Sequence, residues 1–191
     1  MQRGIYSEVV KKGGNFLMEK ELINKIKGGD RQAFKQLYDL HFDYAMRVAA
    51  AVTKNHNTAS DVVQETFIRV YKNIGDFDEE KAFKPWFYRI LINECNRYLK
   101  KQAKVIPMEI DEKVKLEPQI DAHHFEEYED LYDAIQSLDD IQRIPIVLKY
   151  LNDFTEMDIA LALELNINTV KSRLFKGKRK LKELLLKIRE A

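Results

Sequence analysis

Apolar residues recur at every third or fourth position through most of the chain, and this spacing restricts the fold more than any other feature. In an α-helix it places the side chains on one face, whereas a half-buried strand needs strict alternation. The longest stripe consists of Phe34, Leu37, Tyr38, His41, Ala45, Val48 and Val52. No segment keeps a strand-like alternation, so the chain is predicted to be all-α, with His41 as a packed core histidine.

Polar residues mark where the predicted helices begin. Asp30 follows a Gly-Gly pair and is expected to cap the helix that carries this stripe. The segments Thr58–Asp61 and Thr155–Asp158 both have the form of a capping box, in which two side chains satisfy free amides at a helix start. Asn166 is expected to cap a last long helix.

Two prolines set further boundaries. Pro85 suits the first position of a helix that runs to about Gln102, because the amide that proline lacks has no partner there. Residues 75–84 before it are predicted to form a polar loop that carries two phenylalanines. Pro145 is expected to prevent an unbroken helix from Ile141, which leaves a turn and a short helix from Pro145 to Leu151.

Residues 103–126 are predicted to be a linker, because they contain two prolines, few aromatic residues and many carboxylates. Its acidic residues are Glu109, Asp111, Glu112, Glu117, Asp121 and Glu126. The prediction is therefore two small helical domains, residues 18–102 and 127–191, joined by an acidic linker. Met18 is a second candidate for the start of translation, since residues 1–17 lack clear periodicity.

Charge is distributed unevenly along the chain, although 32 basic and 31 acidic residues leave a net charge of only +1. Counted in blocks, residues 84–103 carry +4, residues 104–165 carry −11 and residues 166–191 carry +7. Two basic blocks are typical of a chain that touches a polyanion at two places, the alternative being a basic last helix that only faces water. The single cysteine and the lack of a long apolar run predict a cytoplasmic protein without disulfides.

The last two predicted helices form a short helix, a turn and a basic helix, which is the helix-turn-helix arrangement. With Val170 buried, a rotation of 100° per residue turns the opposite face outward. That face carries Asn168, Lys171, Ser172, Phe175 and Arg179. Asparagine and serine can form hydrogen bonds with base edges, and lysine and arginine can pair with phosphates. The alternative is a helical hairpin whose basic face meets only solvent.

The residues also resemble a known family. Ile159, Ala160, Leu163 and Thr169–Lys176 resemble the promoter-reading helix-turn-helix of bacterial sigma factors of the extracytoplasmic-function (ECF) group, in the sigma-70 family. Asp61–Phe67 is similar to that group's polymerase-binding helix, and Phe83–Phe87 with Ile90 and Asn93 is similar to its DNA-melting segment. The resemblance implies an alternative sigma factor that directs promoter-specific transcription initiation, has no catalytic site and needs no metal or other cofactor.

The resemblance also implies a role for particular residues. It implies that Asp61, Gln64, Glu65 and Arg69 bind the polymerase. Recognition and melting of the minus-ten element fall to Lys84, Arg89, Asn93, Asn96, Arg97 and Lys100, with loop 76–84 and the aromatic helix start as a surface for unstacked bases. Recognition of the minus-thirty-five element falls to Asn168, Thr169, Lys171, Ser172, Arg173, Phe175, Lys176 and Arg179. Trp86 is as well explained by a place in the core.

The sequence departs from the family pattern in three ways: Glu164 replaces a turn glycine, Gly177 replaces a helix alanine, and Arg97 with Lys100 replaces an Asp and Arg pair. By the same resemblance, the expected partners are core RNA polymerase, promoter DNA and a membrane-anchored anti-sigma factor that releases the chain under stress. The acidic linker is expected to follow the RNA path of the polymerase.

Two other functions fit parts of the sequence. A helix-turn-helix regulator could act without polymerase, with its first domain used for sensing or dimerisation. A metal-dependent nuclease would need Asp61 and Glu65 together with His41 or His56. The sequence has no HExxH motif, glycine-rich phosphate loop or nucleophile motif to support catalysis.

Overall fold

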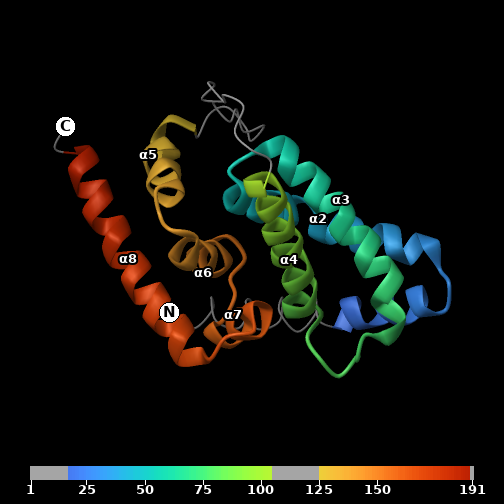
Figure 1. The fold of residues 1–191 in the computed structure, drawn as a ribbon. Helices are drawn as coiled ribbons and strands as arrows, with labels where there is room; N and C mark the ends of the chain where they lie inside the picture. The colour runs from blue at the N-terminus through green and yellow to red at the C-terminus, as the bar shows by residue number, and fades with distance from the viewer. Residues whose placement is uncertain (1–16, 105–124, 190–191) are drawn as a thin grey trace.

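The computed structural model describes residues 17–104 and 125–189, and all regular secondary structure in these ranges is helical (Figure 1). The elements are a helix over residues 17–27, α2 (Arg31–Thr53), α3 (His56–Asn73), the 3-10 helix η1 (Ile74–Asp76), α4 (Phe83–Lys104), α5 (Phe125–Gln136), α6 (Asp140–Leu151), α7 (Glu156–Leu163) and α8 (Ile167–Arg189). The all-α prediction is confirmed. None of these helices is both long and apolar enough to cross a membrane.

The predicted linker and the N-terminal segment lie largely outside the described residues. Of the predicted linker 103–126, the first two residues belong to α4, which ends at Lys104, and the last two belong to α5, which begins at Phe125. Residues 105–124 lie outside the described part. Met18 lies in the first helix, and residues 1–16 before that helix are also outside the described part.

The helix caps follow the sequence at three of four predicted positions. The Asp30 carboxylate accepts hydrogen bonds from the amides of Gln32 and Ala33, at 2.8 and 3.1 Å. Thr155 and Asp158 form the predicted capping box. At the start of α8, the Asn166 side chain accepts a hydrogen bond of 2.8 Å from the amide of Asn168.

The capping box predicted at Thr58–Asp61 is wrong. Asn55 caps α3 instead, and its side-chain oxygen accepts a hydrogen bond of 2.9 Å from the Thr58 amide. Thr58 is the third residue of α3 and is buried, so it does not hold the N-cap position that a capping box requires. The consequence for function is that the Asp61 carboxylate is exposed and has no capping task.

The break predicted at Pro145 is also wrong, because α6 runs unbroken from Asp140 to Leu151. Proline removes one hydrogen bond, here to a carbonyl close to the helix start, and burial of the residues around it offsets that loss. The buried residues are Ile144, Pro145, Ile146, Val147 and Leu148. Pro85 lies in the first turn of α4, where amides lack helical partners in any case.

An aromatic cluster fills the core of the first domain. The His41 ring packs 5.3 Å from the rings of both Phe83 and Phe87, and its Nε2 lies 3.2 Å from the buried Glu19 carboxylate. The prediction that His41 is a packed histidine is therefore confirmed. The loop phenylalanines Phe77 and Phe83 are buried in the same core.

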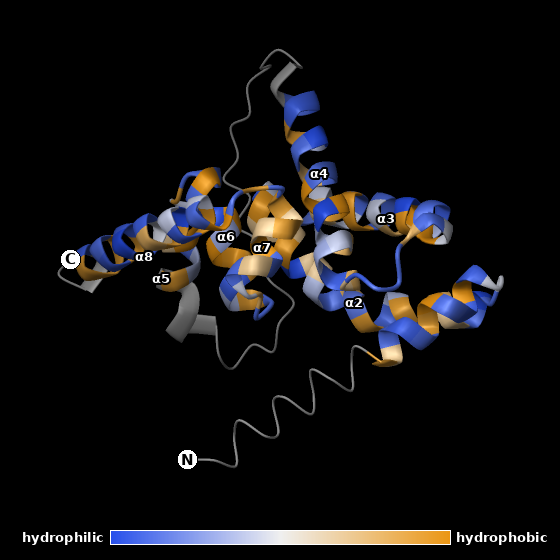
Figure 2. Ribbon diagram, turned by 90° about the horizontal axis from the view of Figure 1, so that it is seen from below, coloured by the Kyte–Doolittle hydropathy of each residue, from blue (hydrophilic) through white to orange (hydrophobic). Residues whose placement is uncertain are grey.

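Helix α4 lies between the two groups of helices and packs on both (Figure 1). Apolar residues line the surfaces on which the helices meet, and the short α7, which packs on α4, is mostly apolar (Figure 2). A continuous cluster of buried apolar residues extends through both domains. The two domains therefore form one packed body.

Buried polar contacts also join the domains. The Arg143 guanidinium, from α6, donates hydrogen bonds of 3.0 Å to the carbonyls of Val52 and Leu138 and one of 2.7 Å to Asp140. The Tyr88 hydroxyl donates a hydrogen bond of 3.1 Å to the Asn152 side-chain oxygen. Burial raises the pKa of Tyr88, so this donor stays protonated at physiological pH.

The structure explains two of the departures from the family pattern. Glu164 ends α7 in the left-handed conformation, with φ 53° and ψ 44°, which favours glycine. Its carboxylate lies 3.2 Å from the Arg89 guanidinium of the first domain. At Gly177, a Cβ atom would lie 3.0 Å from Cγ1 of the buried Ile146, so close packing of α8 on α6 accounts for the glycine.

Replacing Glu164 by Gly should stabilise the fold relative to Glu164→Gln. Both variants lose the carboxylate, but only the glycine relieves a strain of about 1 kcal/mol in the left-handed region. We expect the glycine variant to melt roughly 2–4 °C above the glutamine variant in a thermal denaturation experiment. Equal melting temperatures would show that the left-handed conformation is unstrained.

Cys95, on the buried face of α4, should resist thiol reagents while the protein is folded. Burial raises the pKa of its thiol to about 12, so almost no thiolate exists at about pH 8. A chromogenic disulfide reagent should label the folded chain much more slowly than the chain in guanidinium chloride. Equally fast labelling in both states would contradict the packing of α4.

Candidate nucleic-acid interface

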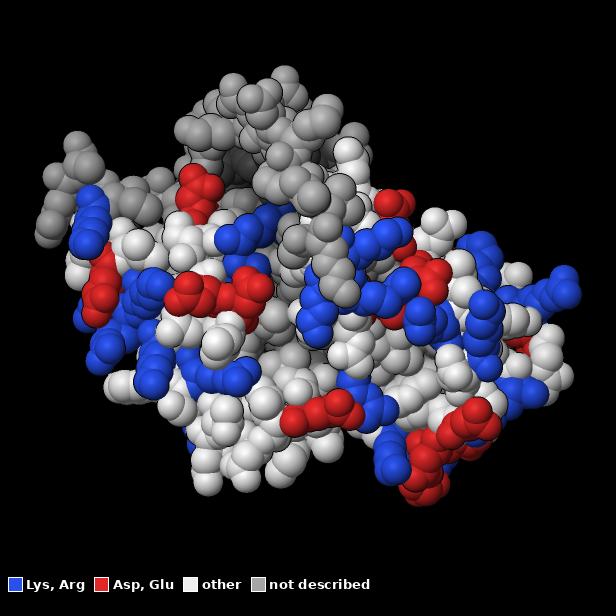
Figure 3. Space-filling view, in the orientation of Figure 1, with Lys and Arg blue, Asp and Glu red and all other residues white. Residues whose placement is uncertain are grey.

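The exposed face of α8 is strongly basic. Val170, Leu174 and Gly177 face the core, and the opposite side carries Asn168, Lys171, Ser172, Phe175, Lys176 and Arg179, all exposed. Thr169 and Arg173 lie half-buried at its edge. Figure 3 shows lysine and arginine side chains gathered over this helix. The arrangement of α7, a tight turn and α8 is therefore that of a helix-turn-helix with its second helix accessible.

Phe175 is the most exposed aromatic residue of this face, with 68% of its surface accessible. A large apolar ring among cations suits contact with a thymine methyl group or with sugar atoms better than contact with water. Lys171 and Lys176 lie on either side of it in the sequence, where they can reach phosphates.

The predicted melting residues lie along α4. Lys84, Asn93, Arg97 and Lys100 are exposed, whereas Arg89 and Asn96 are half-buried. The expected aromatic surface for unstacked bases is wrong, because Phe77, Phe83, Phe87 and Tyr88 are all buried. Of the aromatic residues in segment 76–88, Trp86 alone is partly exposed, and it packs 4.9 Å from the Phe77 ring.

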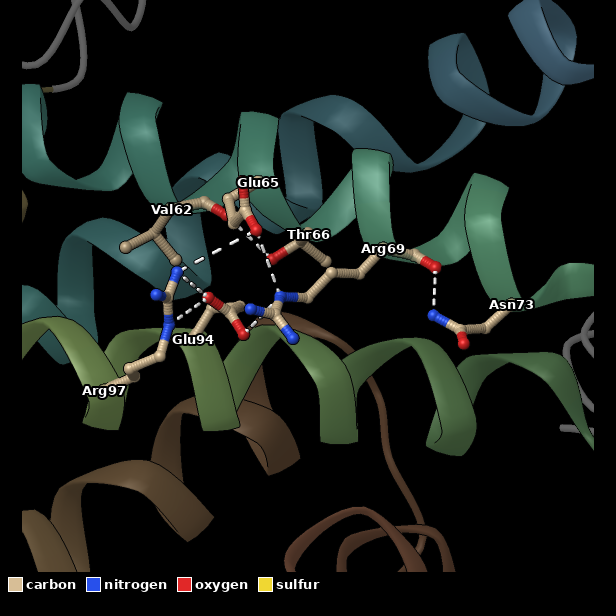
Figure 4. A network of polar contacts seen from close by, with 7 residues as sticks. All are labelled: Val62, Glu65, Thr66, Arg69, Asn73, Glu94 and Arg97. Carbon is tan, nitrogen blue, oxygen red and sulfur yellow. Dashed lines mark hydrogen bonds and ion pairs between the residues drawn. The ribbon is translucent and has the colours of Figure 1, made fainter.

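The predicted polymerase-binding residues lie on α3. Asp61 and Gln64 are exposed, and Glu65 and Arg69 are half-buried because they turn toward α4. Figure 4 shows these last two side chains in a network with Glu94 and Arg97. Residues predicted for polymerase binding and for DNA binding are thus in direct ionic contact.

A hollow of about 200 Å³ lies between α4 and the helix-turn-helix. Its lining includes Asn93 and Asn96 from the first domain and Leu163, Glu164 and Arg173 from the second. Two candidate base-reading residues of α4 therefore face the end of α7 and the start of α8, rather than open solvent alone.

Sequence reasoning missed two residues of these surfaces. Glu94 is buried at the centre of the ionic network. It is the one acidic residue in the basic block 84–103, and this isolated carboxylate could have indicated an ion pair. Ile68 is 40% exposed one helical turn after Gln64 and Glu65. Its position off the buried stripe of α3 would have marked it as an apolar residue on the exposed face.

Comparison with known proteins finds a family match for each of the two domains. Residues 37–105 match the model of Sigma-70 region 2, and residues 128–181 match that of Sigma-70, region 4. A sigma-E factor of the ECF group from Haemophilus influenzae is 30% identical over 177 residues, which cover 85% of this chain and 92% of that protein. The chain belongs to the ECF sigma factors of the sigma-70 family.

Another ECF relative is SigW of Bacillus subtilis, 29% identical over 182 residues that cover 88% of this chain and 97% of SigW. As an ECF sigma factor, the chain is a non-catalytic subunit that directs transcription initiation with RNA polymerase. The predicted family and function are confirmed.

Solved structures agree with this assignment. The structure of CnrH in complex with the cytosolic domain of CnrY has a TM-score of 0.69 at 23% identity, and covers 88% of this chain and 97% of that one. RpoE of Bartonella quintana, solved with the anti-sigma factor NepR, has a TM-score of 0.64 at 25% identity, with coverage of 80% and 96%. The helices are therefore arranged as in CnrH and in the sigma factor RpoE.

Proposed function

We propose that this sigma factor uses three helices for three tasks, one for polymerase binding and two for promoter recognition. α3 binds core RNA polymerase, α4 holds the opened minus-ten element, and the exposed face of α8 reads the minus-thirty-five element as intact duplex. The observation that supports this most directly is the α8 face, where base-reading and phosphate-binding side chains lie together and away from the core.

The task of α3 is supported by the chemistry of its exposed side. Asp61, Gln64 and Glu65 offer acceptors to a basic partner surface, and Ile68 adds an apolar contact within one turn. An apolar residue surrounded by polar ones is a typical centre of a protein interface. The polymerase-binding surface is therefore extended to include Ile68.

The task of α4 depends on its exposed cations and amides. Lys84, Arg97 and Lys100 are placed to hold the backbone of a separated strand, and Asn93 is placed to read a base. Since the other aromatic side chains of segment 76–88 are buried, Trp86 is the one aromatic residue of this segment on which an unstacked base could stack. Base selection then depends mainly on hydrogen bonds from the asparagines.

The two DNA-binding surfaces must separate to occupy one promoter. The minus-ten and minus-thirty-five elements lie about 25 base pairs apart, which is about 85 Å of duplex. In the structure, Asn96 and Arg173 line the same hollow. We therefore expect the domains to move apart when the holoenzyme forms, with residues 103–126 following the RNA path between them.

An anti-sigma factor is the proposed regulator, supported by the similarity to RpoE of Bartonella quintana, which was solved with one. We place the chain in the cytoplasm, where the transcription machinery works, and its partner at the membrane. Affinity purification before and after stress should recover this partner in the unstressed state and core polymerase after stress. Recovery of duplex DNA alone would favour the regulator alternative.

Replacing Lys171 by Ala should weaken holoenzyme binding to duplex DNA that carries the minus-thirty-five element. Loss of one phosphate contact should lower the slope of log affinity against log salt by about 1, without change in affinity for core polymerase. Lys180→Ala is a matched control, because Lys180 lies on the same helix but pairs with Asp139 on its inner side. An equal loss in both variants would refute the assignment of the outer face.

The double substitution of Asp61 and Glu65 by Ala should have the opposite effect. We expect core-polymerase affinity to fall at least ten-fold, while the isolated chain does not lose affinity for duplex DNA. Asp39→Ala with Asp43→Ala on α2 removes the same charge from another exposed surface. If that control weakened polymerase binding as much, or if the α3 variant lost DNA binding instead, the division of tasks would be wrong.

A further inference from the structure

A buried carboxylate joins the polymerase-binding helix to the strand-binding helix. Only 6% of the Glu94 side chain is exposed, and it accepts contacts from two arginines on different helices. Its Oε1 lies 2.7 Å from Nε of Arg69 on α3. Its Oε2 accepts a hydrogen bond of 2.7 Å from Nε of Arg97 on α4 itself (Figure 4).

Glu65 is the second carboxylate of this network, and it faces the same two arginines. Its Oε1 lies 3.2 Å from Nε of Arg69 and 3.9 Å from Nη2 of Arg97. Two carboxylates thus balance two guanidinium groups. The difference is accessibility, because Glu65 is partly exposed on the polymerase-binding surface whereas Glu94 is enclosed.

Arg97 is the most accessible member of the network, with 62% of its side chain exposed. It lines a hollow of about 210 Å³ together with Asp61, Glu65, Glu94 and Lys101. A nucleic-acid phosphate that approaches this hollow must compete with Glu94 and Glu65 for the Arg97 guanidinium. Glu94 already accepts a hydrogen bond from the Arg97 guanidinium, and Glu65 lies 3.9 Å from its Nη2, so a phosphate would meet a guanidinium that is already partly neutralised.

We propose that Glu94 is a positioning residue, an internal counter-ion that holds Arg97 away from nucleic acid until core polymerase engages Glu65. Once the polymerase takes up the Glu65 carboxylate, Arg69 is left with Glu94 as its partner. Arg69 and Arg97 already share Glu94, so without Glu65 the two guanidinium groups compete for that one carboxylate. The Arg97 guanidinium then becomes available to a phosphate of the opened strand. This inference rests on the proposed roles of α3 and α4.

The test uses the full chain and a single-stranded DNA oligonucleotide of randomised sequence, because a phosphate contact does not require the promoter. Glu94→Gln keeps the shape of the side chain and removes its charge. We expect the free chain to bind the oligonucleotide about three- to five-fold more tightly. The slope of log affinity against log salt should steepen by about 0.7, the value for one additional phosphate contact on a single strand.

The matched control is Glu80→Gln, which makes the same change in net charge at an exposed carboxylate paired with Lys20. Its affinity for the oligonucleotide should stay within two-fold of wild type. The gain from Glu94→Gln should also vanish in an Arg97→Ala background. With core polymerase bound, the difference between wild type and Glu94→Gln should shrink, since docking has already released Arg97.

Three results would overturn the inference: no gain from Glu94→Gln, an equal gain from Glu80→Gln, or a gain that persists without Arg97. If Arg97→Ala alone changed neither affinity nor slope in the holoenzyme, the proposed role of α4 would fail instead. Should Glu94→Gln fail to fold, Glu65→Gln tests the same network from its exposed side. A smaller gain that depends on Arg97 supports the inference, and no gain overturns it.

Discussion

Burial of α4 on two sides is the constraint on which the rest of the structure depends. Its residues Phe87, Tyr88, Leu91, Ile92 and Cys95 are almost fully buried, and the helix packs against α2 and α3 on one side and α7 on the other. Little of its surface is then left for function, and what remains exposed is mainly amide and basic. The same packing that stabilises the fold thus determines which side chains can meet nucleic acid.

The helices themselves could largely be predicted from the sequence, because local periodicity and capping act over a few residues. Asp30, Asn166 and the Thr155 capping box were predictable for this reason. Pro145 and Thr58 were not, because tertiary packing decides both. Burial of α6 outweighs the hydrogen bond lost at Pro145, and Asn55 begins α3 one turn earlier than the capping pattern suggested.

The functional surfaces were less predictable, since they depend on contacts between distant segments. The basic face of α8 follows from helical rotation alone and agrees with the structure. Periodicity could not predict that Glu65 and Arg69 turn toward Glu94, nor that Asn96 and Arg173 share a hollow. Both arise from packing between elements far apart in the chain. The single carboxylate in a basic block was the one local sign of the network.

The arrangement also explains how strongly charged surfaces coexist in one small protein. The cations of α4 are partly balanced inside the first domain by Glu94 and Glu65. On the outer face of α8, Lys171 and Lys176 are exposed and have no carboxylate partner within residues 17–104 and 125–189. Like charges that face solvent favour association with a polyanion. This difference agrees with the proposed function, in which α8 binds intact duplex and α4 binds the separated strand.

Site-specific photocrosslinking within the holoenzyme on promoter DNA tests this division most directly. A photoreactive amino acid at Gln64, on α3, should crosslink to core polymerase and not to DNA. The same group at Ser172, on α8, should crosslink to duplex DNA near the minus-thirty-five element. Crosslinks from Gln64 to DNA, or from Ser172 to polymerase alone, would contradict the assignment of the two helices.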